Sequence, residues 1–295
     1  MPKTIIFCSD PIDPKVADAA FQREADAATA LGVSHLLIDH EALDHRHDTK
    51  AALRRLRVDG PIEAIYRGWM LRVEDYALLY DALEAKEVRL VNSPDQYAAC
   101  HWGPVAYPHV APWMAPTAWI AGDEMDDDQA LAYTLAAFGD GPVVLKDWVK
   151  SQAAGYWEEA CFIPSASDLA GAKRVISRFR ELQGNSLVGG LVFRAWRELA
   201  HIGDEVMEWR VFAFDGHPVG CWPRITGMIG DGPPKEIVEA VCAALPSHFA
   251  TADFARLASG GWLLLEVGDG QVSGLPEVAD PQHLLNAILG VSPLR

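Results

Sequence analysis

The stretch Gly261-Trp-Leu-Leu-Leu-Glu266-Val-Gly-Asp269-Gly-Gln-Val-Ser-Gly274 decides how the rest of this chain is interpreted. Its apolar run predicts a strand that ends at Glu266, and Asp269 follows in a turn flanked by glycines. A third carboxylate, Asp253, lies upstream in Thr-Ala-Asp-Phe-Ala. Because alternate side chains of a strand point to opposite faces, a carboxylate at a strand end and one in the next turn can converge on one point.

Three carboxylates at the rim of a sheet are costly unless a cation neutralises them. Oxygen ligands without His or Cys favour Mg²⁺ (or Mn²⁺) over zinc. In enzymes such ions usually hold a nucleotide triphosphate. The sequence therefore predicts a metal site at Asp253, Glu266 and Asp269 and points to ATP as the cofactor.

The composition is that of a globular protein with room for two or three lobes. The chain has 295 residues, of which 50% are hydrophobic and 22% are charged, enough to build sizeable cores. Its net charge of −16 disfavours nucleic acid and anionic membranes as partners. No apolar run approaches the roughly 20 residues that span a bilayer. The N-terminus lacks a signal-peptide pattern, and the five scattered cysteines indicate reduced thiols, so we expect a cytoplasmic protein.

Strands and helices alternate in the first 91 residues, which predicts a parallel α/β lobe. We expect strands at 4–8, 35–38, 62–66 and 88–91, with helices at 14–31 and 76–86. The Pro-rich segment 92–116 is the best candidate for a connection between lobes. The predicted domains are therefore 1–92 and 93–295, the second divided into subdomains at about 93–190 and 191–295.

The second predicted domain mixes helices with strand pairs. Asp215-Gly216 lies between two apolar strands, which is a strong hairpin signal. We expect strands at 142–146, 191–196, 208–214 and 218–224, and helices at 167–183, 235–245 and 281–289. The predicted fold class is thus α/β and α+β.

Lys146 closes the apolar strand Val-Val-Leu-Lys. A lysine at such a position needs an anionic partner, because its desolvation otherwise opposes folding. A nucleotide phosphate or a structural carboxylate would each satisfy it. Lys150 and Ser151 follow on a loop that could reach the same phosphates.

Three arginines, Arg194, Arg210 and Arg224, fall on predicted strands with apolar neighbours. An arginine on a buried strand face usually has a planar anionic partner. A salt bridge to Glu208 or Glu198 would explain any one of them. Three in one lobe favour a binding site for a transferring phosphoryl group.

Other motifs carry less information. The cluster of His40, His45 and His47 among aspartates fits no metal-ligand spacing, and a solvated loop is the better interpretation. No P-loop motif, nucleophile elbow or dinucleotide-binding fingerprint is present in the sequence.

In their order and spacing these features resemble the ATP-grasp superfamily, and the resemblance spans nearly the whole chain. They are Asn92-Ser-Pro94, Pro116-Thr117, the strand that ends at Lys146, the strand 191–196, Arg210 on a hairpin, and Asp253 with Glu266-Val-Gly-Asp269. In detail, the segments around Lys146 and Glu266 resemble a clade found in bacteria and phages that is rich in Arg and Lys sites. The resemblance implies an N-terminal parallel (pre-ATP-grasp) lobe followed by a two-subdomain ATP-grasp fold.

The resemblance also implies roles for individual residues. Lys146 would contact the ATP phosphates, with Lys150 and Ser151 in the loop over them. Arg210 and Arg224 would face the γ-phosphate and the acyl phosphate, and Arg67 could grip a carboxylate substrate. Mg²⁺ would be held by the three carboxylates named above, and the adenine pocket would be lined by Phe193, Arg194, Ala195 and Trp196.

The reaction implied is ATP- and Mg-dependent joining of a carboxylate to an amine through an acyl phosphate, giving an amide or peptide bond, ADP and phosphate. A kinase on the same fold that phosphorylates a hydroxyl is one alternative. A non-catalytic nucleotide-binding paralogue is another, motivated by Ala195 in the hinge and by a phosphate lid with only Gly155 nearby. Small molecules or peptides with carboxylate and amine groups are the expected partners, and the sequence leaves the oligomeric state open.

Overall fold

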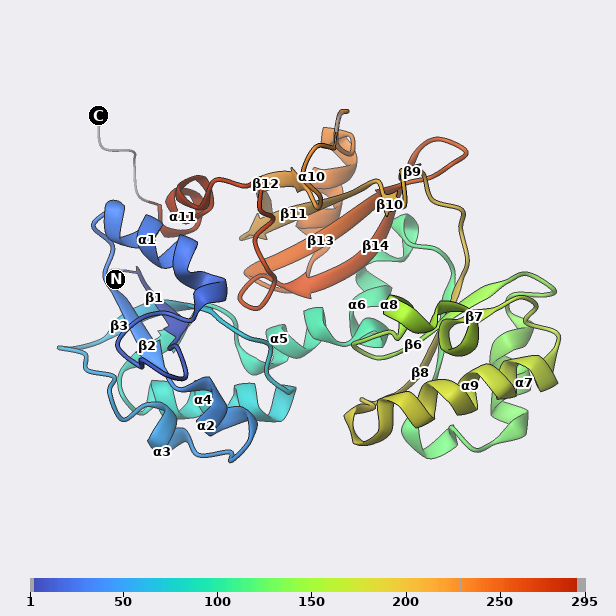
Figure 1. The fold of residues 1–295 in the computed structure, drawn as a ribbon, viewed down its shortest axis with the longest axis horizontal. Helices are drawn as coiled ribbons and strands as arrows, with labels where there is room; N and C mark the ends of the chain where they lie inside the picture. The colour runs from blue at the N-terminus through green and yellow to red at the C-terminus, as the bar shows by residue number, and fades with distance from the viewer. Residues whose placement is uncertain (1–2, 229, 291–295) are drawn as a thin grey trace. The chain divides into compact units, whose positions relative to one another are not determined.

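The computed structural model describes residues 3–228 and 230–290, and it confirms the mixed α/β and α+β class. The chain forms two compact units, each assembled from separated segments (Figure 1). The first unit contains residues 1–100, 207–254 and 267–295, and the second contains 101–206 and 255–266. The domain boundaries expected after residues 92 and 190 stay a prediction. Within the described residues, no helix is both long enough and apolar enough to cross a membrane.

The first unit opens with the predicted parallel sheet, drawn in blue in Figure 1. Its strands lie in the order β2-β1-β3-β4. Its central strand is fully buried from Ile5 to Cys8 because helices cover the sheet. The strands are β1 (Lys3–Cys8), β2 (His35–Ile38), β3 (Ile62–Arg67) and β4 (Val88–Leu90). The helices are α1 (Gln22–Ala30), α2 (His40–Asp44), α3 (Thr49–Ala52) and α4 (Val73–Glu84).

The first helix is shorter than the predicted 14–31. Asp10 accepts hydrogen bonds from the backbone N–H groups of Ile12 and Asp13, both at 2.8 Å, which holds the chain in a turn. Asp18 then caps a short 3₁₀ turn by accepting from Ala20 N at 2.9 Å, and α1 begins at Gln22. The residues before Asp18 therefore do not continue the helix.

The Pro-rich segment 92–116 is largely helical, which corrects its interpretation as a plain connection. It forms α5 (Pro94–His101) and α6 (Gly103–Val110). Pro94 is the first residue of α5 and Pro104 is the second of α6, positions where the missing N–H of proline costs nothing.

The second sheet of the structure has the strand order β12-β11-β13-β14. The predicted hairpin is confirmed: β11 and β12 pair antiparallel across Asp215-Gly216, both of which have positive φ. The strands are β11 (Glu208–Phe214), β12 (His217–Pro223), β13 (Phe249–Arg256) and β14 (Trp262–Asp269). The helix α10 (Lys235–Ala244) packs against β12.

Strand β14 is longer than predicted, because it continues past Glu266 to Asp269. Residues three apart on a strand point to opposite faces. Accordingly the side chain of Glu266 is exposed, whereas Asp269 is fully buried. The expectation that Asp269 lies in the turn is wrong; the turn begins one residue later.

One apolar core links the two sheets of the first unit. Phe212 and Phe249 of the second sheet pack in the same cluster as the buried residues of the parallel sheet. The last helix, α11 (Pro281–Leu289), adds Leu284 and Ile288 and packs against α1 and β12. The C-terminal helix thereby joins the two sheets of this unit.

The second unit is built on an antiparallel sheet in the order β5-β8-β6-β7. Its apolar core lies between this sheet and the helices α7 and α9. The strands are β5 (Thr117–Ala121), β6 (Val143–Asp147), β7 (Phe162–Ile163) and β8 (Gly190–Ala195), with a small pair β9 (His201–Ile202) and β10 (Glu205–Val206). The helices are α7 (Asp128–Ala136), α8 (Ala153–Tyr156), a π-helical turn (Trp157–Cys161) and α9 (Leu169–Gln183).

Candidate functional site

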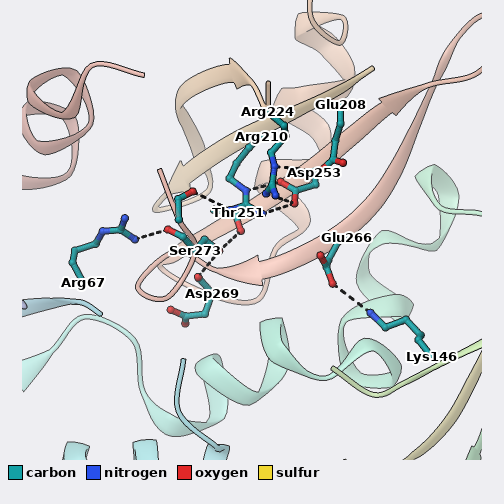
Figure 2. Close-up of polar contacts among 11 residues, drawn as sticks. Arg67, Lys146, Glu208, Arg210, Arg224, Thr251, Asp253, Glu266, Asp269 and Ser273 are labelled. Carbon is teal, nitrogen blue, oxygen red and sulfur yellow. Dashed lines mark hydrogen bonds and ion pairs between the residues drawn. The ribbon is translucent and has the colours of Figure 1, made fainter. Parts of the chain in front are cut away.

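Lys146 lies on β6 in the second unit with its side chain 16% exposed. Its Nζ donates to Oε1 of Glu266 on β14 at 3.3 Å (Figure 2). Of the two partners that the sequence allowed, the structure thus has the carboxylate. Glu266 is 52% exposed, so the pair is accessible to an incoming ion or phosphate.

Asp147, the residue after Lys146, shapes the turn that carries Lys150. One carboxylate oxygen accepts from the backbone N–H groups of Val149, at 2.7 Å, and Lys150. The other accepts from Gln183 Nε2 at 3.0 Å and from Val188 N at 3.3 Å. This buried aspartate therefore fixes the loop start, and Lys150 emerges exposed one turn beyond Lys146. Sequence reasoning missed it, although an Asp that ends a strand before a turn is a known signal.

Arg194 on β8 is turned toward its neighbouring strands. Its Nε donates to Thr117 Oγ1 at 3.3 Å, and its Nη1 donates to the carbonyl of Leu265. Burial lowers the pKa of Arg194, and the charge of Glu266 opposes that shift. The arginine thus ties β8 to the strand that carries Glu266.

The other residues expected to line an adenine pocket differ in exposure. Phe193 is fully buried in the core of the second unit. Ala195 pairs with Val143, and Trp196 is 37% exposed with its ring edge-on to Phe162 at 6.0 Å. Of the predicted set, Trp196 offers the largest exposed apolar surface, and its role at adenine stays a prediction.

His101 is a polar neighbour of Lys146 and Lys150 that sequence reasoning did not single out. It ends α5, and the next turn is anchored by a hydrogen bond from Gly103 N to the carbonyl of Trp148 at 2.7 Å. Burial first, and then the charges of Lys150 and Lys146, lower the pKa of His101 to about 4, against an opposing effect of Glu266. The imidazole is therefore neutral at physiological pH.

This shift predicts a pH dependence of stability. Between pH 6.5 and 4 the unfolded chain binds a proton at His101 that the folded chain does not. The free energy of unfolding therefore falls as the pH drops through this range. We expect the loss between about pH 7 and about pH 4.5, measured by urea unfolding, to be smaller in His101→Gln than in the wild type. An equal loss in both proteins would show that His101 titrates normally.

Asp253 on β13 is held by two arginines of the first unit (Figure 2). Arg210 donates to both of its oxygens, from Nε at 2.8 Å and from Nη2 at 2.6 Å. Arg224 approaches one oxygen at 3.5 Å and Glu208 at 3.7 Å. Asp253 is 5% exposed and Arg210 is 12% exposed, so this bidentate pair is largely desolvated.

Asp269 lies in an internal polar network of the same unit. It accepts from Asn92 Nδ2 at 2.6 Å and from the backbone N–H of Gln271 at 2.8 Å. Burial raises the pKa of Asp269 to about 7, against the lowering effect of these hydrogen bonds. Asn92 also bonds the backbone of Phe249 in both directions, at 2.7 and 2.9 Å, and so fixes the carboxylate against β13.

Arg67 ends β3 and is fully buried. Its guanidinium forms a two-fold pair with Glu24 of α1 and donates to the carbonyl groups of Gly270 and Ser273. In this arrangement Arg67 joins internal segments of the first unit. Its assignment to a substrate carboxylate stays a prediction, and such a ligand would have to displace Glu24.

Across residues 3–228 and 230–290, no three His, Cys, Asp or Glu side chains gather in a way that could hold a metal ion. The histidine-rich stretch is not the solvated loop expected from the sequence, because His40 begins the helix α2; His47 pairs with the buried Asp75, and His45 pairs with Asp44 at 3.6 Å. The assignment of Asp253, Glu266 and Asp269 to a common ion stays a prediction.

A family model for an ATP-grasp domain, described as R(2)K clade family 3, matches residues 137–288, just over half of the chain. No curated protein matches the sequence.

Solved structures that resemble the whole chain share this architecture. D-cycloserine synthetase DcsG is 16% identical, with a TM-score of 0.63 over 97% of this chain and 99% of that one. The ATP-grasp ligase PsnB, solved with a phosphomimetic variant of its minimal precursor, Mg and ADP, is 14% identical, with a TM-score of 0.60 over 97% and 96%. An ATP-grasp RimK domain protein from Sphaerobacter thermophilus is 14% identical, with a TM-score of 0.61 over 98% and 100%. At these identities the likeness establishes the fold, and the fold expected from the sequence resemblance is confirmed.

Proposed function

Because this chain belongs to family 3 of the R(2)K clade of ATP-grasp domains, we propose that it is an ATP- and Mg-dependent ligase that joins a carboxylate to an amine. The substrate carboxylate attacks the γ-phosphorus of ATP, forming an acyl phosphate and releasing ADP. The amine then attacks the acyl carbon, phosphate leaves with the C–O bond electrons, and the amine loses a proton to give the amide.

The observation that carries this proposal is the arrangement at Lys146. A mostly buried lysine holds an anionic oxygen of the exposed Glu266, and Lys150 lies one turn away on a loop fixed by Asp147. His101 stays neutral beside them and adds no competing charge. Preorganised cations in a partly desolvated site are the groups that bind and stabilise phosphoryl oxygens.

Arg210 and Arg224 would supply positive charge to the transferring phosphoryl and acyl phosphate groups. Both are held by Asp253, which fixes the direction of each guanidinium before a substrate arrives. Arg224 is 37% exposed and retains donors toward solvent. Preorientation of this kind lowers the cost of reorganisation during transfer.

Carboxylate oxygens are ligands that suit Mg²⁺. In nucleotide sites this ion is usually bound by one or two carboxylates together with phosphate oxygens, so a complete protein cage is not required. Asp253, Glu266 and Asp269 would provide the carboxylates, and Glu266 is already paired with a cation, Lys146, that a metal could replace. When bound, Mg²⁺ would neutralise charge on the phosphates.

A thermal-shift titration with a non-hydrolysable ATP analogue tests the proposal. A ligand that binds only the folded state raises its stability by mass action. We expect the midpoint to rise with the analogue, and to rise further with Mg²⁺ present. The absence of any shift at millimolar analogue, with or without Mg²⁺, would contradict a nucleotide site.

The variant Glu266→Gln should lose most of the Mg²⁺-dependent part of nucleotide binding and little of the metal-free part. Glutamine keeps the length of the side chain and removes the charge that a divalent ion requires. Isothermal titration with and without Mg²⁺ measures both parts. Glu277→Gln, a surface glutamate outside the proposed site, is the matched control. Equal losses with and without metal would instead indicate that Glu266 acts by holding Lys146.

Product analysis separates this ligase from a kinase on the same fold. A ligase releases free phosphate and forms an amide, whereas a kinase leaves a stable phosphoester on a hydroxyl. Phosphate release that depends on both an acid and an amine would support the ligase.

A further inference from the structure

The segment Gly270–Gly274, which follows β14, is held by Arg67 of β3. The guanidinium Nη1 donates to the carbonyl of Gly270 and to that of Ser273, the latter at 2.8 Å. Figure 2 shows Arg67 directed at this segment. Two bonds from one nitrogen to carbonyls three residues apart fix the path of the turn between them.

Glu24 of α1 occupies the rest of the guanidinium. Its two oxygens accept from Nε and Nη2 of Arg67, both at 2.7 Å. Arg67 is fully buried and the side chain of Glu24 is 5% exposed. Phe212 lies under the guanidinium at 5.7 Å. The two charges therefore compensate each other inside the protein. Attraction between buried charges offsets the cost of their desolvation only when the geometry is good, as it is here.

Gln271, at the centre of the segment, makes further bonds to the same part of the first unit. Its side-chain oxygen accepts from Tyr66 N at 3.3 Å, and its backbone oxygen accepts from Gly68 N at 3.2 Å. Its Nε2 donates to the hydroxyl of Tyr76 at 2.8 Å. The turn is therefore bound to β3 on both sides of Arg67.

The other side of the segment touches the residues proposed for phosphoryl transfer. The carbonyl of Gly274 accepts from Arg210 Nη1 at 2.9 Å. The hydroxyl of Ser273 lies 2.7 Å from that of Thr251, two residues before Asp253 on β13. Arg210 is thus fixed at one end by Asp253 and at the other by this turn.

We propose that Arg67, backed by Glu24, is a positioning residue that sets the turn Gly270–Gly274 and, through Gly274, the orientation of Arg210 on Asp253. This inference rests on the proposed function, because it gives Arg210 its role at the γ-phosphate. It assigns to Arg67 an internal task in place of contact with a substrate carboxylate.

The test uses the full-length protein with Glu24→Gln and Arg67→Gln combined, which removes both buried charges together and avoids leaving one unpaired. Isothermal titration compares Mg·AMPPNP with Mg·ADP, which lacks the γ-phosphate. We expect binding of Mg·AMPPNP to weaken at least about 10-fold, and binding of Mg·ADP to weaken less than about 3-fold, since one lost oriented interaction costs roughly this factor.

Two controls separate positioning from general destabilisation. Asp75→Asn removes another buried carboxylate of the first unit, which pairs with His47 and takes no part in the bonds described for the turn. It should lower the thermal midpoint and leave both nucleotide affinities unchanged. Adding Arg210→Gln to the combined variant should cost less AMPPNP affinity than Arg210→Gln costs the wild type, because the two act through one contact.

Equal weakening of both nucleotides, or none in the combined variant, would overturn the proposal while leaving the proposed function standing. Binding of neither nucleotide to the wild type would overturn the proposed function. Amide hydrogen exchange of peptides that cover residues 267–275 then tests whether Arg67 holds the turn Gly270–Gly274. Unchanged exchange in the combined variant overturns the proposal, and faster exchange confined to this turn supports it.

Discussion

Replacing Lys146 with alanine is expected to abolish ATP turnover and leave the fold intact. The lysine lies at the end of a core strand, but its Nζ contacts Glu266 and is not itself part of the apolar core. Loss of one preorganised donor to a developing oxyanion costs roughly 100- to 1,000-fold in rate. The effect is measured as the rate of ADP release in the presence of an acid and an amine, monitored with a coupled enzyme assay.

Lys173→Ala provides the matched control for this experiment. That lysine also lies in the second unit and pairs with a carboxylate, Asp128, at 2.6 Å, but on the outer face of α9. Its removal should leave turnover within about two-fold of the wild type, because exposed pairs contribute little. Full activity of Lys146→Ala would remove this lysine from the mechanism. Circular dichroism of both variants checks that the fold is kept.

Replacing Asp253 with asparagine is expected to have the largest effect on stability. The change removes the negative charge that Arg210 and Arg224 share, and deprives a largely buried guanidinium of its charged partner. Removing one member of a buried pair costs about 3–5 kcal/mol. Urea unfolding should therefore show a clearly lower free energy of unfolding, and the proposed phosphoryl-transfer activity should be lost with it.

Glu208→Gln distinguishes a specific loss at Asp253 from any loss of charge around Arg224. Glu208 is 3.7 Å from Arg224 and is more exposed than Asp253. Its replacement should cost under about 1 kcal/mol, in the range of exposed pairs. If Asp253→Asn is no more destabilising than Glu208→Gln, the bidentate pair contributes little to folding.

Part of the site could be foreseen because its signals are local in sequence. Lys146 ends a strand of alternating apolar residues, and the hairpin of β11 and β12 is marked by Asp215-Gly216. These features depend on side-chain period and on turn conformation, which neighbouring residues determine. The extension of β14 to Asp269 was missed, because a glycine at 268 suggests a turn.

The partners of the charged residues could not be foreseen in the same way. Glu24 is 43 residues from Arg67 in the chain, and Lys146 is 120 residues from Glu266. A charged residue among apolar neighbours indicates that an oppositely charged partner is needed. The sequence does not show which carboxylate is that partner. Arg67, which was predicted to contact a substrate, pairs with Glu24 inside the protein. The lowered pKa of His101 and the hydrogen bond from Gln183 to Asp147 likewise depend on segments that are distant in the chain.

From the sequence by itself came most of the strands, the longer helices, a resemblance to the ATP-grasp superfamily that the family model bears out, and the residue types that suit phosphate and metal chemistry. These follow from local periodicity and from motif order, which need no knowledge of distant contacts. Only the tertiary structure decided that Lys146 pairs with Glu266, that Asp253 holds Arg210, and that Arg67 is buried on the turn after β14. The physical reason is that ion pairs form where folding brings opposite charges together away from water. The packing of segments that are distant in the chain determines which charges come together.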